Sequence, residues 1–101
     1  MSPRQRLSNR RPNVTFDFEV GGLKYTCTAG LTDGQIRELF LNNHKSNSAA
    51  DVNARDAAIV FSIAIQCGAD PETIRRALTR NSNGSASGPL AAALDALAQE
   101  T

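Results

Sequence analysis

The chain has 101 residues, a formal net charge of +1 at pH 7 and few aromatic residues, namely four Phe, one Tyr and no Trp. This length suits one domain with a modest core, and such small domains often gain stability by assembling with copies of themselves. No apolar run approaches the ~20 residues that cross a bilayer, and the N-terminus lacks the apolar part of a secretory signal. A soluble protein of the cytoplasm is therefore expected, of the host cytoplasm if the chain is viral.

The small net charge hides an uneven distribution. The first twelve residues contain Arg4, Arg6, Arg10 and Arg11 but no acid, and the remaining seven basic and ten acidic residues sum to −3. We therefore expect a flexible basic arm over residues 1–12 and a single, mildly acidic domain over residues 13–101. That acidity argues against a large footprint for polymeric DNA or RNA.

Alternating residues predict a β-hairpin at the start of the domain. Apolar and polar residues alternate from Val14 to Val20 and again from Leu23 to Thr28, with Gly21-Gly22 between them. Two adjacent glycines favour a two-residue hairpin turn, because both can take positive φ. A second turn at residues 32–34 leads to a third strand at 35–41. Its apolar residues fall on both faces, so its core-facing side stays open.

A long helix is predicted after a polar loop. Ser48 followed by Asp51 has the spacing of a capping box, and the helix should run to about Cys67. Between Ala57 and Ile65 only Ser62 is polar. A helix that is apolar all round is buried on more than one side, so we expect this one to meet another copy of the chain.

Two shorter helices complete the predicted fold. Gly68 should end the long helix, Asp70 should cap a second helix that has Pro71 in its first turn, and Pro89 should begin a third that runs to about Gln99. The second helix is expected to bury Ile74, Ala77 and Leu78 and to expose Arg75, Arg76 and Arg80. The fold class is therefore α+β, a three-stranded antiparallel meander followed by two or three helices packed on one sheet face.

Cysteine and histidine usage predicts neither catalysis nor metal binding. Cys27 and Cys67 both lie in apolar patterns and are expected to be buried free thiols, although a disulfide between them stays open. His44 lies in a loop without an obvious nucleophile beside it. Two cysteines and one histidine do not make a zinc site, and no phosphate-binding glycine motif is present. We expect no enzyme activity, no catalytic residue and no cofactor.

Anion binding is the better-supported chemistry. Helix N-termini carry free N–H groups and a partial positive charge, and small polar loops precede the expected helix starts near Ser48 and Pro89. Basic and amide side chains near these starts could bind phosphate and read a base or ribose, and an exposed Phe40 could stack on a base. The expected ligand-binding residues are Lys45, Asn53, Arg55, Asp56, Arg80, Asn81, Ser82 and Phe40.

An alternative function is DNA binding. The small residue Ala64, the turn at Gly68 and the apolar Ile74 are spaced as in a helix-turn-helix, and Thr73–Arg80 has the look of a recognition helix. Asp70 and Glu72, however, would stand where base edges are read.

Four segments of the chain resemble a known family. The segments DVNARDAAI, SIAIQCG, ETIRRALTR and GPLAAALD are similar to the TSCPD-type domain, which occurs at the C-terminus of cobalamin-dependent ribonucleotide reductases and as small free-standing proteins. The resemblance covers about Val14 to Ala98. The cysteine motif that names the family is absent, since NSNGSASGP follows Arg80, and so is the catalytic barrel of the reductases. In architecture the chain is also similar to phage sponges that sequester cyclic nucleotide immune signals.

These observations predict a non-catalytic, oligomeric, nucleotide-binding module. The specific expectation is a phage-type protein that sequesters a cyclic nucleotide or an ADP-ribose-derived signal. One alternative is an accessory or regulatory relative of the cobalamin-dependent reductase that acts on a protein partner, and the second is the helix-turn-helix regulator.

Overall fold

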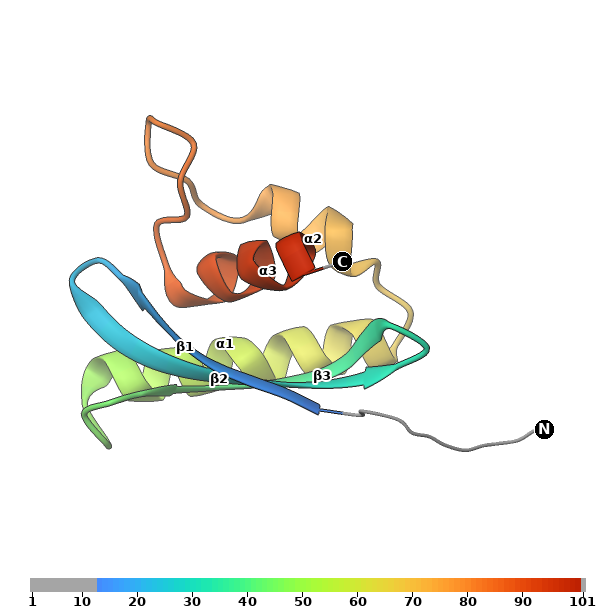
Figure 1. The fold of residues 1–101 in the computed structure, drawn as a ribbon, viewed down its shortest axis with the longest axis horizontal. Coiled ribbons are helices and arrows are strands. Elements are labelled where there is room, and N and C mark those ends of the chain that lie inside the picture. The colour runs from blue at the N-terminus through green and yellow to red at the C-terminus, as the bar shows by residue number, and fades with distance from the viewer. Residues whose placement is uncertain (1–12, 101) are drawn as a thin grey trace.

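The computed structural model describes residues 13–100, which form three strands followed by three helices (Figure 1). Strands β1 (Asn13–Val20), β2 (Leu23–Thr32) and β3 (Gln35–Asn43) make one antiparallel sheet in the order β1-β2-β3. Helices α1 (Ala49–Gln66), α2 (Pro71–Ala77) and α3 (Pro89–Glu100) follow. The predicted α+β class and element order are confirmed. The arm expected at residues 1–12 lies outside the described residues.

Two tight turns connect the strands. Gly21 and Gly22 have φ values of 63° and 77°, and Asp33 and Gly34 have φ values of 54° and 77°. Positive φ at both central residues is the geometry whose twist matches that of the flanking strands. The Gly21-Gly22 turn therefore sets the β1–β2 register directly, with Val20 opposite Leu23 and Phe16 opposite Cys27.

One extra residue in β3 decides which of its side chains face the core. Glu38 pairs with Gly30 and Ile36 pairs with Leu31, so Arg37 has no partner residue in β2. Such a bulge shifts the alternation of a strand by one residue. It places Ile36 and Leu39 on the same face, which is why the apolar residues of this segment do not fit a regular two-residue period.

Helix α1 lies alongside β3 and protects the free edge of that strand. The backbone of Leu39 is hydrogen-bonded to the Ser62 hydroxyl, the carbonyl of Arg37 accepts from the Gln66 amide at 3.0 Å, and the N–H of Asn43 donates to Asp51 at 2.9 Å. The six residues from Asn43 back to Arg37 span roughly 20 Å of strand. The fifteen residues from Asp51 to Gln66 span about 22 Å of helix, so the two elements match in length.

The core lies between the sheet and the helices. In Figure 1, α3 covers one face of the sheet, while α1 continues the sheet beyond β3. The largest fully buried side chains are Phe61 of α1, Leu39 and Leu41 of β3, and Cys27 of β2. Ala93, Leu94 and Leu97 of α3 complete this cluster.

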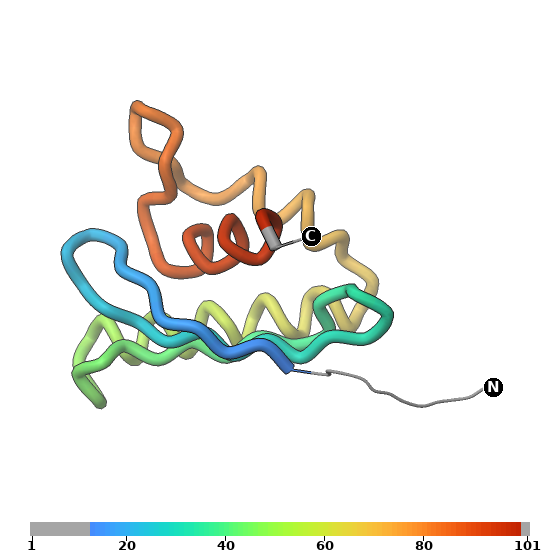
Figure 2. Tube along the Cα trace, in the orientation of Figure 1, coloured from blue at the N-terminus to red at the C-terminus, as the bar shows by residue number. Residues whose placement is uncertain are grey.

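Helix α2 is held mainly by polar contacts. Its residues Ile74 and the following Leu78 are half-buried against the core, but Ala77 is exposed, which corrects the expectation that Ala77 is buried. The loop from α2 to α3 folds back on itself, with Arg80 bridged to Ala86, and it projects from the body of the molecule (Figure 2).

Candidate functional site

The N-terminus of α1 is closed by the chain's own side chains. Ser48 caps the helix by accepting from the N–H of Asp51 at 3.1 Å, as predicted. Asp51 is 3% exposed and accepts from the N–H groups of Asn47 and Asn43 at 3.0 and 2.9 Å. These two backbone donors, Asn47 first, hold the pKa of Asp51 below its usual value. Asp51 therefore joins the β3–α1 loop to the helix as an ionised structural group.

Four of the expected ligand-binding residues surround this helix start. Lys45, Asn53, Arg55 and Asp56 are all exposed. A guanidinium nitrogen of Arg55 lies 3.6 Å from a carboxylate oxygen of Asp51, so Arg55 already has an acidic neighbour. The structure thus places these four residues at one end of α1, with their side chains accessible.

The other predicted group lies in the loop between α2 and α3. Arg80 is half-buried and binds Asp95 of α3 through both terminal nitrogens, at 2.6 and 2.9 Å, and also donates to the carbonyl of Arg75. The hydrogen bond with Asp95 raises the pKa of Arg80 and lowers that of Asp95. Asn81 contacts Ser85, Ala86 and Ser87 within the loop, and Ser82 is exposed.

The two predicted groups are not brought together within one chain. In Figure 1 the loop 79–88 lies on the far side of α3 from the start of α1. Arg80 is engaged in holding α3, and Arg75 binds both Glu72 and Asp95. The arginines that the helix-turn-helix alternative would use to read DNA are therefore occupied as well, because Arg76 also binds Glu72.

An apolar patch is the feature that the sequence only partly revealed. Helix α1 was expected to be buried on more than one side, but its buried residues Ala54, Ala58, Phe61 and Ile65 lie on one side only. Val52, Ile59, Val60 and Ile63 are exposed, as is Phe40 of β3, with exposed fractions between 45% and 66%. We call these five residues the α1 patch.

The members of the α1 patch lie on one side of the molecule. Ser62 faces β3, and by helical geometry Ile59 and Ile63 are rotated by about 60° and 100° from it, away from the core. Phe40 follows the core-facing Leu39, so it points to the opposite face of the sheet. That is the face toward which Ile59 and Ile63 turn beyond the β3 edge. Phe40, expected as a stacking group for a base, is therefore exposed beside aliphatic residues.

His44 has a hydroxyl neighbour that sequence reasoning missed. Its Nε2 lies 2.9 Å from the Thr26 hydroxyl, which donates to Asp17 at 2.7 Å. The single hydroxyl proton of Thr26 is therefore directed to Asp17 and not to His44. In a nucleophile that is activated by a base, the hydroxyl donates its hydrogen bond to that base. The Thr26 hydroxyl donates to Asp17 instead, so His44 is not placed to activate it. The sequence offered one signal for part of this contact, because a hairpin turning at Gly21-Gly22 places Asp17 opposite Thr26.

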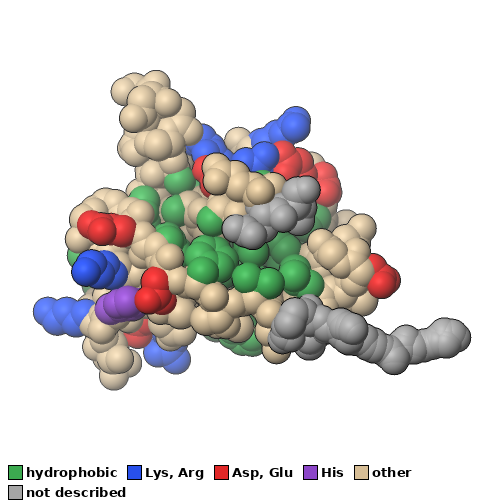
Figure 3. Space-filling view, viewed as in Figure 1, with side chains coloured by type: hydrophobic (Ala, Val, Ile, Leu, Met, Phe, Trp, Pro, Cys, Tyr) green, Lys and Arg blue, Asp and Glu red, His purple; other side chains and the backbone are tan. Residues whose placement is uncertain are grey.

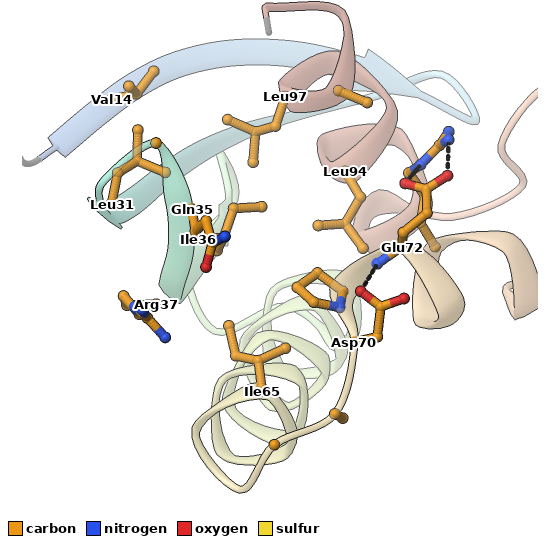
Figure 4. A pocket seen from close by; sticks show the side chains of 16 residues that line it. Val14, Leu31, Gln35, Ile36, Arg37, Ile65, Asp70, Glu72, Leu94 and Leu97 are labelled. Atoms are coloured by element: carbon orange, nitrogen blue, oxygen red, sulfur yellow. Dashed lines mark hydrogen bonds and ion pairs between the residues drawn. The ribbon is translucent and has the colours of Figure 1, made fainter.

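A cavity opens at the other end of α1. It has a volume of about 700 Å³ and lies between the β2–β3 turn, the end of α1, the start of α2 and α3. Leu31, Ile36, Ile65, Leu94 and Leu97 point toward a common space in Figure 4. The space-filling view shows hydrophobic side chains at the surface between α3 and the sheet, with the charged residues of α2 above them (Figure 3). None of the expected ligand-binding residues lines this cavity.

Cysteine placement differs in part from the expectation. Both thiols are free, and Cys27 is buried as predicted, but Cys67, the residue that follows α1, is exposed. Burial raises the pKa of Cys27 to about 12. Within the described residues no three His, Cys, Asp or Glu side chains are grouped to hold a metal ion. The described helices include none with the length and apolar character needed to cross a membrane.

Comparison with known proteins identifies relatives of part of this chain. It is 36% identical over 77 residues, 75% of its length, to a vitamin B12-dependent ribonucleotide reductase of Agrobacterium fabrum. It is 33% identical over 69 residues, 67% of its length, to the enzyme of that name from Bradyrhizobium diazoefficiens. The matched part spans about 6% of either reductase.

Other comparisons add no further relative. No family model matches the chain, and no solved structure matches it. The resemblance to phage sponges receives no support, whereas the alternative that links the chain to the reductases does. The chain is therefore a homologue of one short segment of the vitamin B12-dependent ribonucleotide reductases, consistent with the TSCPD-type module that its motifs resemble.

Proposed function

We propose that this chain is a non-catalytic module that assembles with itself and serves a vitamin B12-dependent ribonucleotide reductase as an accessory subunit. The chain is similar to only about 6% of each reductase. This small share supports a role in which the chain assists the catalytic protein and does not itself catalyse the reaction. The observation that carries the proposal is the α1 patch. Exposed apolar residues that gather on one side of a molecule mark protein interaction sites.

A second copy of the chain fits the α1 patch best. Val52, Ile59 and Ile63 recur at intervals of seven and four residues, which is the spacing of a helix that packs along another helix. Asp56 is the charged residue within this stripe. Two antiparallel α1 helices related by a two-fold axis near Ile59 would separate the two Asp56 carboxylates and oppose the helix dipoles.

Light scattering on the purified full chain tests the assembly. We expect a dimer or larger species at micromolar concentration, and the double variant Ile59→Asp, Ile63→Asp should be monomeric, because it buries four carboxylates in the paired interface. Gln99→Asp, which adds a carboxylate at an exposed position on α3, is the matched control and should assemble normally. A monomeric wild-type chain would refute self-assembly.

Co-purification tests the accessory role separately. A tagged full chain should retain a vitamin B12-dependent ribonucleotide reductase expressed in the same cell, and the retained enzyme should show altered turnover. A chain that assembles but neither retains the reductase nor changes its turnover would overturn the accessory role alone.

A nucleotide is the second candidate partner. The relatives' name refers to ribonucleotides, and the exposed Lys45, Asn53 and Arg55 form a polar group at the start of α1. A nucleotide present at one hundred times its Kd stabilises a folded chain by about 2.7 kcal/mol. We expect a nucleotide panel to raise the Tm of the wild type and to raise that of Arg55→Gln less. An unchanged Tm across the panel contradicts this part of the proposal.

A further inference from the structure

The cavity at the end of α1 has the size and composition of a small-molecule site. Its volume of about 700 Å³ falls within the range of roughly 300–1,000 Å³ that is typical of ligand pockets. Its apolar walls come from three parts of the fold, namely Leu31 and Ile36 of the sheet, Ile65 of α1, and Leu94 and Leu97 of α3. A ligand with an apolar body would therefore contact side chains that the rest of the fold already holds in place.

The β3 bulge brings a charged residue to this apolar cavity. Successive side chains of a regular strand point to opposite faces, yet Ile36 and Arg37 both line the cavity. The reason is that Arg37 is the extra residue of the bulge. Bulges of this kind commonly redirect a side chain next to a functional site.

Among the described arginines, Arg37 is also the one without an acidic partner. Of the five arginines that the structure describes, Arg55, Arg75, Arg76 and Arg80 each lie in an ion pair, and Arg37 does not. The hydrogen bond that Arg37 makes with Gln66 uses its backbone carbonyl and not its guanidinium. A guanidinium at the mouth of an apolar cavity is suited to bind one anionic group.

The acidic residues of the cavity are already engaged and lie across from Arg37. Asp70 caps α2 by accepting from the Glu72 N–H and the Thr73 hydroxyl. Glu72 is bound by Arg75 and Arg76. Figure 4 shows Asp70 and Glu72 on the opposite side of the cavity from Arg37. The Arg37 end is therefore the end that favours an anion.

We propose that this cavity binds a small amphipathic molecule whose apolar body lies against Ile36, Ile65 and Leu97 and whose single anionic group is bound by Arg37. The site is separate from the α1 patch and from the residues expected to bind phosphate. The proposed site goes beyond the accessory role, because it would let a small molecule bind to a module whose accessory role depends on protein contacts.

Calorimetric titration of the full chain with octanoate, 1-naphthalenesulfonate and 1-octanol tests this proposal. The two anions distinguish an aliphatic from an aromatic body, and 1-octanol keeps the aliphatic body without the charge. We expect at least one of the anions to bind. Arg37→Gln should weaken that anion about tenfold, the loss of one charge-assisted contact, and should leave 1-octanol unchanged. Lys24→Gln, which removes an exposed cation of β2 outside the cavity, should change neither.

A second variant locates the apolar part of the site. Leu97→Ala enlarges the cavity and removes apolar contact, so it should weaken both an anion and 1-octanol, whereas Ile59→Asp on the α1 patch should weaken neither. The proposal is overturned if neither anion binds, if Arg37→Gln binds anions as tightly as the wild type does, or if Ile59→Asp abolishes binding.

Discussion

The hydroxyl of Ser62 accepts from the N–H of Leu39 at 2.8 Å and donates to the carbonyl of the same residue at 3.1 Å. One side chain of α1 thereby satisfies both outward-facing backbone groups of a residue in an edge strand. Open strand edges are sites of unwanted pairing, and covering an edge with a helix is one way in which proteins prevent it. The only polar residue between Ala57 and Ile65 thus joins the helix to the sheet.

Ser62→Ala should destabilise the fold. The substitution leaves the N–H and C=O of Leu39 without partners in a half-buried setting, which costs about 1–3 kcal/mol. Urea unfolding of the two proteins measures the difference. Ser82→Ala, at an exposed loop position, is the control and should stay within about 0.5 kcal/mol of the wild type. Equal stability of the two variants would show that α1 packing alone protects the edge.

Acid should weaken the ion pairs within α2. A hydrogen bond from Arg75, aided by Arg76, lowers the pKa of Glu72 from 4.5 to about 2 in the folded chain. Because the folded pKa lies below the unfolded one, this contribution to stability is complete above about pH 4.5 and is lost as the pH falls toward 2. Thermal unfolding measured across this window should show a falling Tm, and Glu72→Gln should show a shallower fall. Parallel curves for the two proteins would contradict the prediction.

Asp95→Asn should loosen the segment from α2 to α3 before the rest of the fold. Asp95 accepts from both Arg75 and Arg80, so it links α2 and the following loop to α3. Hydrogen exchange should therefore speed up over residues 71–88 while β2, which is paired on both sides, keeps its protection. Asp33→Asn, in the exposed β2–β3 turn, serves as the control. Uniform acceleration along the chain would mean that Asp95 supports the whole fold instead.

The two thiols should react at very different rates. Cys67 is exposed, whereas Cys27 is buried and burial raises its pKa to about 12, so its thiolate is scarce near neutral pH. The test uses the folded Ile59→Asp, Ile63→Asp variant, because this variant is expected to be monomeric and no second copy would then cover a cysteine. A thiol reagent should modify one of its cysteines quickly and the other only after denaturation. Cys67→Ser should remove the fast phase. A fast phase that survives in Cys67→Ser would place Cys27 within reach of solvent.

The local elements could be predicted from the sequence because their signals are local. Gly21-Gly22 specifies a tight turn through its access to positive φ, and Ser48 with Asp70 specifies helix starts through short-range capping bonds. The alternation from Val14 to Val20 likewise follows from one face of β1 being turned to the core. Each of these depends on residues a few positions apart, so the chain order β-β-β-α-α-α could be derived before any contact was known.

The placement of the candidate sites could not be predicted in the same way. Whether Ile59, Val60 and Ile63 are buried depends on which side of α1 meets β3. That side is fixed by hydrogen bonds of Ser62, Gln66 and Asp51 with the backbone of β3. The bonds of Ser62 and Gln66 join residues more than twenty positions apart in the chain. Arg80, which the sequence predicts as a phosphate ligand, is paired with Asp95, fifteen residues later, and no local pattern around Arg80 indicates that pairing.

What the sequence by itself determined is the set of secondary structures, their caps and turns, and the relationship to a reductase segment. Only the tertiary structure decided which apolar residues of α1 stay exposed, that Arg37 occupies a bulge at the mouth of a cavity, and that the other described arginines are held in ion pairs. The physical reason is range. Capping and turn formation act between neighbours in the chain, whereas burial and ion pairing depend on which distant surfaces meet.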